Sequence, residues 1–248
     1  MAGVTITVAS VGDAHQAALL ADAKRVEYER YSPVFWRPAE NAVERHEPWL
    51  EKCLSDDGHT SYAARNEERL VGIVIAAHTV FPPPFGSDPE PSWLVDDFFV
   101  DSENDWQSFG TQLLEAVEQA ARGSGASRMV VLSARKDEPK RAMLADLGYQ
   151  RGASWWVHPV QPVEGELPTL RDTDAVVGPA PPVYDPGGLT ALALEMRDPA
   201  DVPTFDRWAS ASNAILAIVP ARSSDSALEE ALRLGGYEPA SDWLIKDI

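Results

Sequence analysis

The sequence predicts an α/β (α+β) fold in which helices flank a mixed central sheet, followed by a smaller C-terminal β-α-β-α-β unit. Segments that alternate apolar and polar residues are interspersed with segments whose apolar residues recur at spacings of three and four. These are the periods of strands and helices. In the second half of the chain strands alternate with helices, which favours at least one parallel crossover. The 248 residues are 44% apolar, enough to form a core of this kind.

The first unit, residues 1–158, is predicted to have the element order β-α-α-β-β-β-α-β-α-β. Asp13 stands where an N-cap would start the first helix, and Gly148 stands where the last helix would end. A proline-rich stretch over 82–91 predicts the loop before the fourth strand. In chain order we predict a strand at 4–8, helices at 14–30 and 42–54, strands at 60–65, 70–80 and 93–100, a helix at 107–122, a strand at 129–132, a helix at 138–147 and a strand at 149–157.

The composition changes over residues 159–188, where Pro, Gly, Asp and Val dominate with little periodicity. This stretch predicts an irregular connection. The second unit, residues 189–248, is predicted to contain strands at 189–196, 215–219 and 237–248 and helices at 202–210 and 226–234. It repeats the end of the first unit, because Asp137, Leu144, Gly148, Tyr149 and Trp155 match Asp225, Leu232, Gly236, Tyr237 and Trp243. We interpret this as a degenerate internal duplication, with chance similarity as the alternative.

Charge and composition exclude several classes of partner. The chain has 21 Lys and Arg residues against 39 Asp and Glu residues, a net charge of −18 that disfavours nucleic acid and anionic membranes as partners. It contains no apolar run of the roughly 18 residues that a membrane span requires, and its start has no basic, signal-like region. The single cysteine, Cys53, excludes an intramolecular disulfide and a Cys-rich zinc site. Together with the missing span and signal, this predicts a cytoplasmic protein. The histidines show no ligand spacing, so we expect no metal.

The most informative stretch is 95–114, where a strand, a polar loop with one glycine, Gly110, and an amphipathic helix follow one another. The first backbone N–H groups of a helix are unpaired, and the helix dipole places partial positive charge there. A diphosphate could bind to such amides without the help of a lysine. The sequence therefore predicts an anion site at this loop.

This stretch and its flanks resemble the GNAT superfamily of acyl-CoA-dependent N-acyltransferases. The run from Asp96 to Val100 is similar to the family's central strand, Gln107 to Gly110 to the end of its phosphate loop, and Leu113-Leu114 to its helix. Downstream, Asp137 lies where the family usually has Asn, and Gly148-Tyr149 is similar to its Gly-Phe/Tyr signature. The resemblance covers roughly residues 4–157. It implies a GNAT-like fold for the first unit, with acetyl-CoA as co-substrate.

The resemblance also implies which residues form the site. The residues expected to bind acetyl-CoA are Phe98, Phe99, Val100, Gln107, Ser108, Phe109, Gly110, Thr111 and Asp137. Neighbouring residues of a strand point to opposite faces, so only one of Asp96 and Asp97 is expected to face the site. We favour Asp97 as the catalytic carboxylate, although a structural role is the alternative. The expected acceptor wall contains Tyr31, Trp36 and Trp93, whose rings could hold a cationic amine or could simply pack in the core.

Two functions follow. The first is N-acyl transfer from acetyl-CoA to a primary amine, either a small molecule or a peptide amine, by direct attack. The second is a catalytically inactive GNAT-like module that binds a ligand or a protein. The second is favoured by three departures from the family pattern, namely Asp105 at the basic position, Ser108 at the first glycine and Leu144 at the usual tyrosine. The C-terminal unit, which lacks a loop glycine over 197–203, is expected to extend the sheet or to mediate a homodimer.

Overall fold

The computed structural model of the chain describes residues 3–80, 91–171 and 173–248. The proline-rich stretch predicted at 82–91 lies outside the described residues except for Pro91. The elements of the first unit are β1 (Thr5–Val8), α1 (Ala14–Glu29), α2 (Ala42–Ser55), β2 (His59–Asn66), β3 (Arg69–Val80), β4 (Pro91–Val100), α3 (Thr111–Ser124), β5 (Arg128–Ala134), α4 (Glu138–Asp146) and β6 (Gln150–Pro159). They are followed by β7 (Thr173–Gly178), β8 (Leu189–Met196), α5 (Val202–Ala211), β9 (Ala214–Arg222), α6 (Ser226–Leu234) and β10 (Glu238–Asp247).

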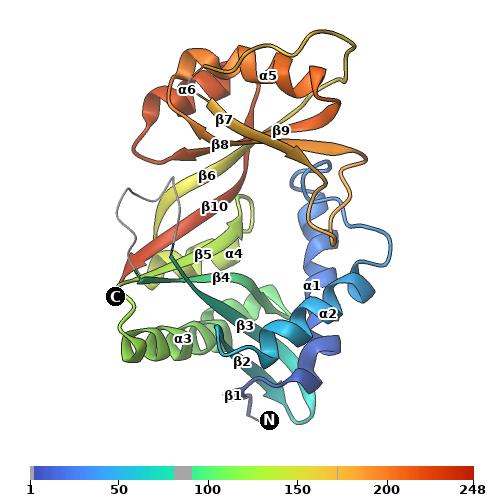
Figure 1. Cartoon of the computed structure of the whole chain (residues 1–248). Coiled ribbons are helices and arrows are strands. Elements are labelled where there is room, and N and C mark those ends of the chain that lie inside the picture. The colour runs from blue at the N-terminus through green and yellow to red at the C-terminus, as the bar shows by residue number, and fades with distance from the viewer. Residues whose placement is uncertain (1–2, 81–90, 172) are drawn as a thin grey trace.

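The strands of the described residues form one ten-stranded sheet in the order β1-β2-β3-β4-β5-β10-β6-β9-β8-β7. The pairs β4–β5 and β8–β9 are parallel and the remaining pairs are antiparallel, so the predicted mixed α/β sheet is confirmed. The sheet runs through the molecule from β1 near the N-terminus to β7 and β8 under the last two helices (Figure 1). None of the helices in the described part of the chain is both long and apolar enough to cross a bilayer.

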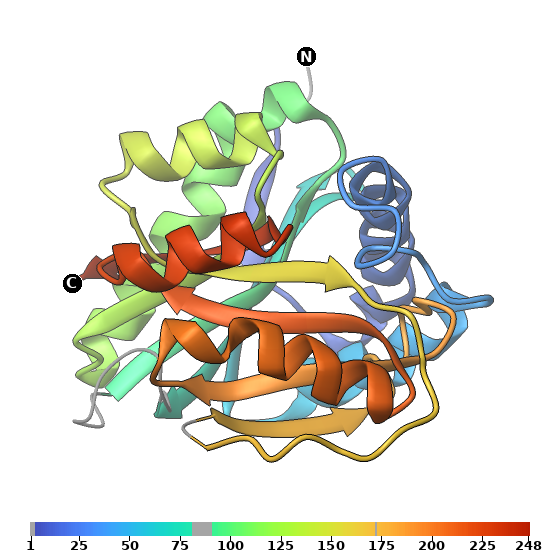
Figure 2. The same cartoon turned by 90° about the horizontal axis from the view of Figure 1, so that it is seen from above.

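Helices cover the two faces of the sheet differently. On one face α3 and α4 bury a core that includes Val131 and Leu244, and further along the same face α5 and α6 bury a second core around Trp156. On the opposite face α1 and α2 pack over Ile73 and Ile75 of β3. The two long helices α1 and α2 therefore lie over the first half of the sheet (Figure 2). The rest of that face is where the site is found.

The last strand of the chain lies in the middle of the sheet. β10 is inserted between β5 and β6, and β6 in turn pairs with β9 of the second unit. Each unit therefore contributes a strand to the other. The buried Asp242 of β10 links them further, because it accepts hydrogen bonds from Arg135 at the end of β5 and from Ser154 of β6, each at 2.7 Å.

The equivalent elements of the two units agree in several details, and the duplication stays a prediction. Helices α4 and α6 each have nine residues, and strands β6 and β10 each have ten. Asp137 and Asp225 both cap the helix that follows them, accepting a backbone N–H at 3.2 and 3.0 Å. Tyr149 and Tyr237 both donate a hydrogen bond to an acidic residue of the preceding long helix, Glu118 of α3 and Asp206 of α5.

Two parts of the chain differ from the sequence prediction. The stretch 159–188 is not wholly irregular, because it contains strand β7 at the edge of the sheet. Its sequence, Thr-Asp-Ala-Val-Val-Gly, does not alternate apolar and polar residues, which explains why periodicity did not indicate it. The helical segment predicted to begin at 107 begins earlier, with a 3₁₀ turn at Glu103–Asp105 and a π-helical turn at Trp106–Gly110 ahead of α3.

Candidate functional site

A β-bulge in β4 shapes the site. Val74 of β3 pairs with Phe98 and Ala76 pairs with Val95, so two residues of β4, Asp96 and Asp97, lie opposite one residue of β3. Beyond Val95 the parallel pairing with β5 also ends. A bulge rotates the local side chains away from strict alternation. The expectation that Asp96 and Asp97 point to opposite faces is therefore wrong, because both line the same cavity.

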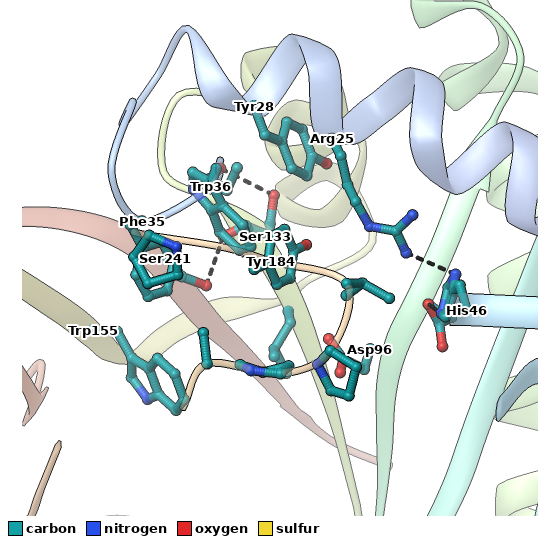
Figure 3. A pocket seen from close by; sticks show the side chains of 18 of the residues that line it. Arg25, Tyr28, Phe35, Trp36, His46, Asp96, Ser133, Trp155, Tyr184 and Ser241 are labelled. Atoms are coloured by element: carbon teal, nitrogen blue, oxygen red, sulfur yellow. Dashed lines mark hydrogen bonds and ion pairs between the residues drawn. The ribbon is translucent and has the colours of Figure 1, made fainter. Parts of the chain in front are cut away.

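This cavity has a volume of about 450 Å³ and lies where β4 and β5 separate. One wall comes from α1, α2 and the loop between them, and another from β6, β9 and β10 of the exchanged part of the sheet (Figure 3). Residues 180–186 close it as a strap. Backbone hydrogen bonds of 3.0 Å from Ala39 to Val183 and from Asp185 to Arg37 attach the strap to the α1–α2 loop.

Asp97 is paired with His46 from α2, and His46 is in turn bonded to Arg25 from α1. His46 of α2 places its Nε2 atom 3.3 Å from Asp97 Oδ1, and its Nδ1 atom 2.7 Å from Nη2 of Arg25 of α1 (Figure 3). Because a guanidinium only donates hydrogen bonds, Nδ1 accepts, and the ring proton therefore belongs on Nε2 facing Asp97. The chain Arg25–His46–Asp97 thus fixes the orientation of this carboxylate.

Asp96 is the less engaged of the two acids. Among the residues that the structure describes, none forms a hydrogen bond or ion pair with it. Its side chain is open to the cavity, so a small molecule can reach it. Desolvation by the surrounding protein, followed by the charge of Asp97, raises the pKa of Asp96 to about 6. Asp96 can therefore gain and lose a proton near neutral pH.

Lys140 of α4 reaches the cavity from the other face of the sheet. It is 2% exposed, and its Nζ donates a hydrogen bond of 3.2 Å to the carbonyl of Phe98 in β4. The ammonium also lies over the rings of Phe98 and Trp106, at 5.2 and 5.4 Å from their centroids. Burial lowers the pKa of Lys140 to about 8, against the opposing influence of Asp137 and Asp96.

The lowered pKa of Lys140 gives a prediction for stability. The folded protein disfavours the ammonium, so Lys140→Met should raise the free energy of unfolding at pH 7 by about 1–3 kcal/mol. Between pH 8 and 10.5 the unfolded chain keeps a proton that the folded chain has lost, so the parent should gain stability as the pH rises. The Met variant should lack this rise. Urea unfolding at pH 7 and pH 10 measures both effects, with the exposed Lys136→Met as control. A less stable Lys140→Met protein at pH 7 would contradict the prediction.

A second buried pair supports α4 from below the cavity. The hydroxyl of Tyr28 in α1 donates a hydrogen bond of 2.6 Å to Asp137, which is fully buried and caps α4. Burial, together with the charge of Asp137, raises the pKa of Tyr28 well above its usual value, so the hydroxyl keeps its proton. Asp137, expected to contact acetyl-CoA, is thus occupied in joining α1 to α4.

The predicted anion loop is wound into helical turns. The N–H of Trp106 is bonded to Glu103, and the N–H of Thr111 is shared between the carbonyls of Ser108 and Trp106. The Trp106 side chain is fully buried, and a Cβ on Gly110 would lie 3.1 Å from its ring. This glycine therefore accommodates the indole ring.

The remaining predicted site residues are dispersed. Phe99 lines the cavity, whereas Phe98, Val100 and Phe109 lie in the core on the α3 face. Gln107 and Ser108 are exposed at the first turns of the helical segment, bonded to Asp146 and to the carbonyl of Asp105.

The predicted acceptor wall is only partly assembled. Trp36 lines the cavity, whereas Tyr31 points back to Glu27 in α1 and donates a hydrogen bond to it. Trp93 is buried at the far end of β4, where its ring stacks on His78 with centroids 4.0 Å apart. Of the three aromatic residues expected to contact the acceptor, only Trp36 is therefore placed to do so.

Sequence reasoning missed Arg25, His46, Lys140 and Tyr184 as residues of the site. His46 has no neighbouring ligand-type residue in the sequence, and only packing of α2 brings it to Asp97. Lys140 could have been found from the sequence. The capping residue Asp137 fixes where α4 begins, and the start of the helix determines on which of its faces Lys140 lies. Tyr184 lies in the stretch interpreted as a connection.

Comparisons with known proteins complete the description. The model of the acetyltransferase (GNAT) family matches residues 23–149. A proposed acetyltransferase from Thermoplasma acidophilum superposes over 97% of this chain and 98% of its own, with a TM-score of 0.57 at 14% identity. A tetramutant of a Bacillus halodurans protein superposes over 66% of this chain and 99% of its own, with a TM-score of 0.51 at 14% identity. A proposed acetyltransferase from Clostridium acetobutylicum, solved with acetyl-CoA, superposes over 60% of this chain and 90% of its own, with a TM-score of 0.49 at 10% identity. No curated protein matches the sequence significantly.

Proposed function

Because the chain belongs to the acetyltransferase (GNAT) family, we propose that it transfers an acetyl group from acetyl-CoA to a primary amine bound beside Asp96. One observation carries this proposal. The bulge in β4 turns into the cavity a carboxylate that has no hydrogen bond or ion pair among the described residues, at the point where β4 and β5 separate. An ammonium group would neutralise that carboxylate, and the partly desolvated surroundings would strengthen the attraction between them.

The residues around β4 fit the acyl end of acetyl-CoA. After Val95 and Val131 the two strands no longer pair, so the backbone of β4 near Phe98 and Phe99 has an edge to which an amide-containing arm can bind. The first turns before α3, with Gln107 and Ser108 exposed, are the proposed contact for the diphosphate. When bound, acetyl-CoA supplies its acetyl group as a thioester, which an amine can attack directly.

The chain's own residues have distinct proposed roles. Asp96 binds the acceptor ammonium and, with a pKa of about 6, takes up its proton directly or through water. Asp97, which the sequence favoured as the base, is engaged by His46 and serves to hold the acidic pair in place. Lys140 carries a proton near neutral pH and lines the same cavity, so we assign to it the return of a proton to the leaving group.

A second candidate function is a GNAT-like module that binds a ligand without catalysis. It is favoured by the acidic start of the helical segment, where Asp101, Glu103 and Asp105 would repel a diphosphate. The indole of Trp106, buried against Gly110, also fills space at this position.

Titration calorimetry with acetyl-CoA and an assay of thiol release with primary amines separate the two functions. We expect binding at micromolar concentrations and thiol release that depends on the amine. Ser108→Glu should weaken acetyl-CoA binding roughly tenfold or more, because it adds negative charge at the proposed diphosphate contact. Gln112→Glu, exposed one turn later, is the matched control and should have a smaller effect. No binding at high micromolar acetyl-CoA would eliminate the enzyme in favour of the binding module.

A further inference from the structure

The cavity has two chemically different ends. At one end Asp96 is the carboxylate without a hydrogen bond or ion pair among the described residues, whereas Asp97 is engaged by His46. The cationic side chains nearby have contacts of their own, although Nε and Nη1 of Arg25 have no hydrogen-bond partner among the described residues. Arg25 contacts His46 and lies 5.8 Å from the ring centroid of Tyr184, and Lys140 is bonded to β4. This end therefore offers a place for one positive charge.

The other end is apolar and aromatic. Trp155 of β6 and Trp243 of β10 lie side by side with ring centroids 5.7 Å apart, and Phe35 meets Trp155 edge-on at 6.2 Å. Leu216 and Ile218 of β9 continue this wall. The hydroxyls of Ser133 and Ser241, which also line it, are bonded to backbone carbonyls at 3.2 and 3.3 Å. A ligand body here would find surfaces to pack against and few free polar groups.

We propose that the cavity selects monoamines with an apolar or aromatic body, the ammonium on Asp96 and the body against Trp155, and that the exchanged strands of the sheet set this preference. The inference rests on the proposed function, since it names the acceptor class of that same site. A polyamine fits poorly, because its further charges would meet Arg25 or Arg45 or would lie against the apolar wall. A volume of about 450 Å³ suits a compact ligand rather than a folded protein surface.

Calorimetry without an acyl donor tests this directly on the full chain. The probes are 2-phenylethylamine, the neutral 2-phenylethanol, the anionic 3-phenylpropionate and the polycation spermine. We expect 2-phenylethylamine to bind most tightly. Asp96→Asn should weaken its binding roughly 10- to 100-fold and leave 2-phenylethanol unchanged, because the lost interaction is a charge-assisted hydrogen bond. Asp101→Asn, an exposed acid just after β4, is the control and should not change either affinity.

The aromatic wall is tested with a second pair of variants. Trp155→Leu should weaken the binding of 2-phenylethylamine roughly 3- to 30-fold, and Trp155→Phe should retain most of it. Trp208→Leu, on α5 outside the cavity, is the matched control. Tighter binding of spermine, the absence of amine binding, or equal effects of Trp155→Leu and Trp208→Leu would overturn the inference. Binding of 2-phenylethylamine in this pattern without acetylation would refute the proposed function alone, and acetylation confined to hydrophilic amines would refute the acceptor class alone.

Discussion

Deletion of residues 181–248 should abolish folding of the remaining chain as a soluble monomer. The deletion removes β10 from between β5 and β6, leaving the paired edges of two central strands without partners. It also removes Asp242, the shared partner of Arg135 and Ser154. The loss should exceed the 5–15 kcal/mol by which a typical domain is stable. Circular dichroism and size-exclusion chromatography of residues 1–180 measure the outcome.

The control for this deletion removes residues 164–169 only, an exposed stretch that belongs to none of the strands. This variant should fold and elute like the parent, since short exposed loops tolerate change. Co-expression of residues 1–180 with residues 181–248 should restore a folded complex, because the exchanged strands can pair across two chains. A folded, monomeric 1–180 fragment would show that the second unit does not complete the sheet.

Asp96→Asn should lower kcat/KM for acetyl transfer by roughly 10²- to 10⁴-fold, the usual contribution of a general base. The amide has nearly the same shape as the carboxylate, so the cavity should keep its form. In the parent, activity should rise as the pH passes through about 6, where Asp96 loses its proton. The residual activity of the variant should lack this rise. Steady-state kinetics from pH 5 to 8 measure both.

Asp101→Asn is again the matched control, because Asp101 lies just beyond β4 and is paired with Arg69 at the surface. It should keep the pH profile of the parent, because it leaves Asp96 in place. Full activity in Asp96→Asn would show that Asp96 is not the base and would leave Asp97 as the candidate for that role.

The elements of the fold follow from local patterns, but their neighbours in the sheet do not. Apolar periodicity places β8, α6 and β10 within a few residues of their positions, and the Gly-Tyr and Trp residues shared by the two units predict a duplication. Which strand lies between β5 and β6 depends on pairing between residues such as Leu132 and Trp243, which are far apart in the chain. No local period encodes that choice.

The site was harder to predict for a related reason. Strict alternation in β4 separates Asp96 from Asp97, and only the extra residue of the bulge turns both into one cavity. His46 and Lys140 arrive from helices on opposite faces of the sheet, so neither is close to β4 in sequence. The phosphate loop was predicted from its likeness to a family motif. In the structure the large apolar side chain of Trp106 is buried, which favours a helical turn at this position.

The central position of β10 also bears on how the protein is made. The strand that completes the pairing of β5 and β6 is synthesised after both of them, so neither has this partner until the chain has been translated through β10. Until then the edges of β5 and β6 stay open, a state that is prone to misassembly with other nascent chains. Pairings over such sequence separations are slow to form. Translation through β10 is therefore required before β5 and β6 are paired, and a chain that terminates before β10 would keep both edges open.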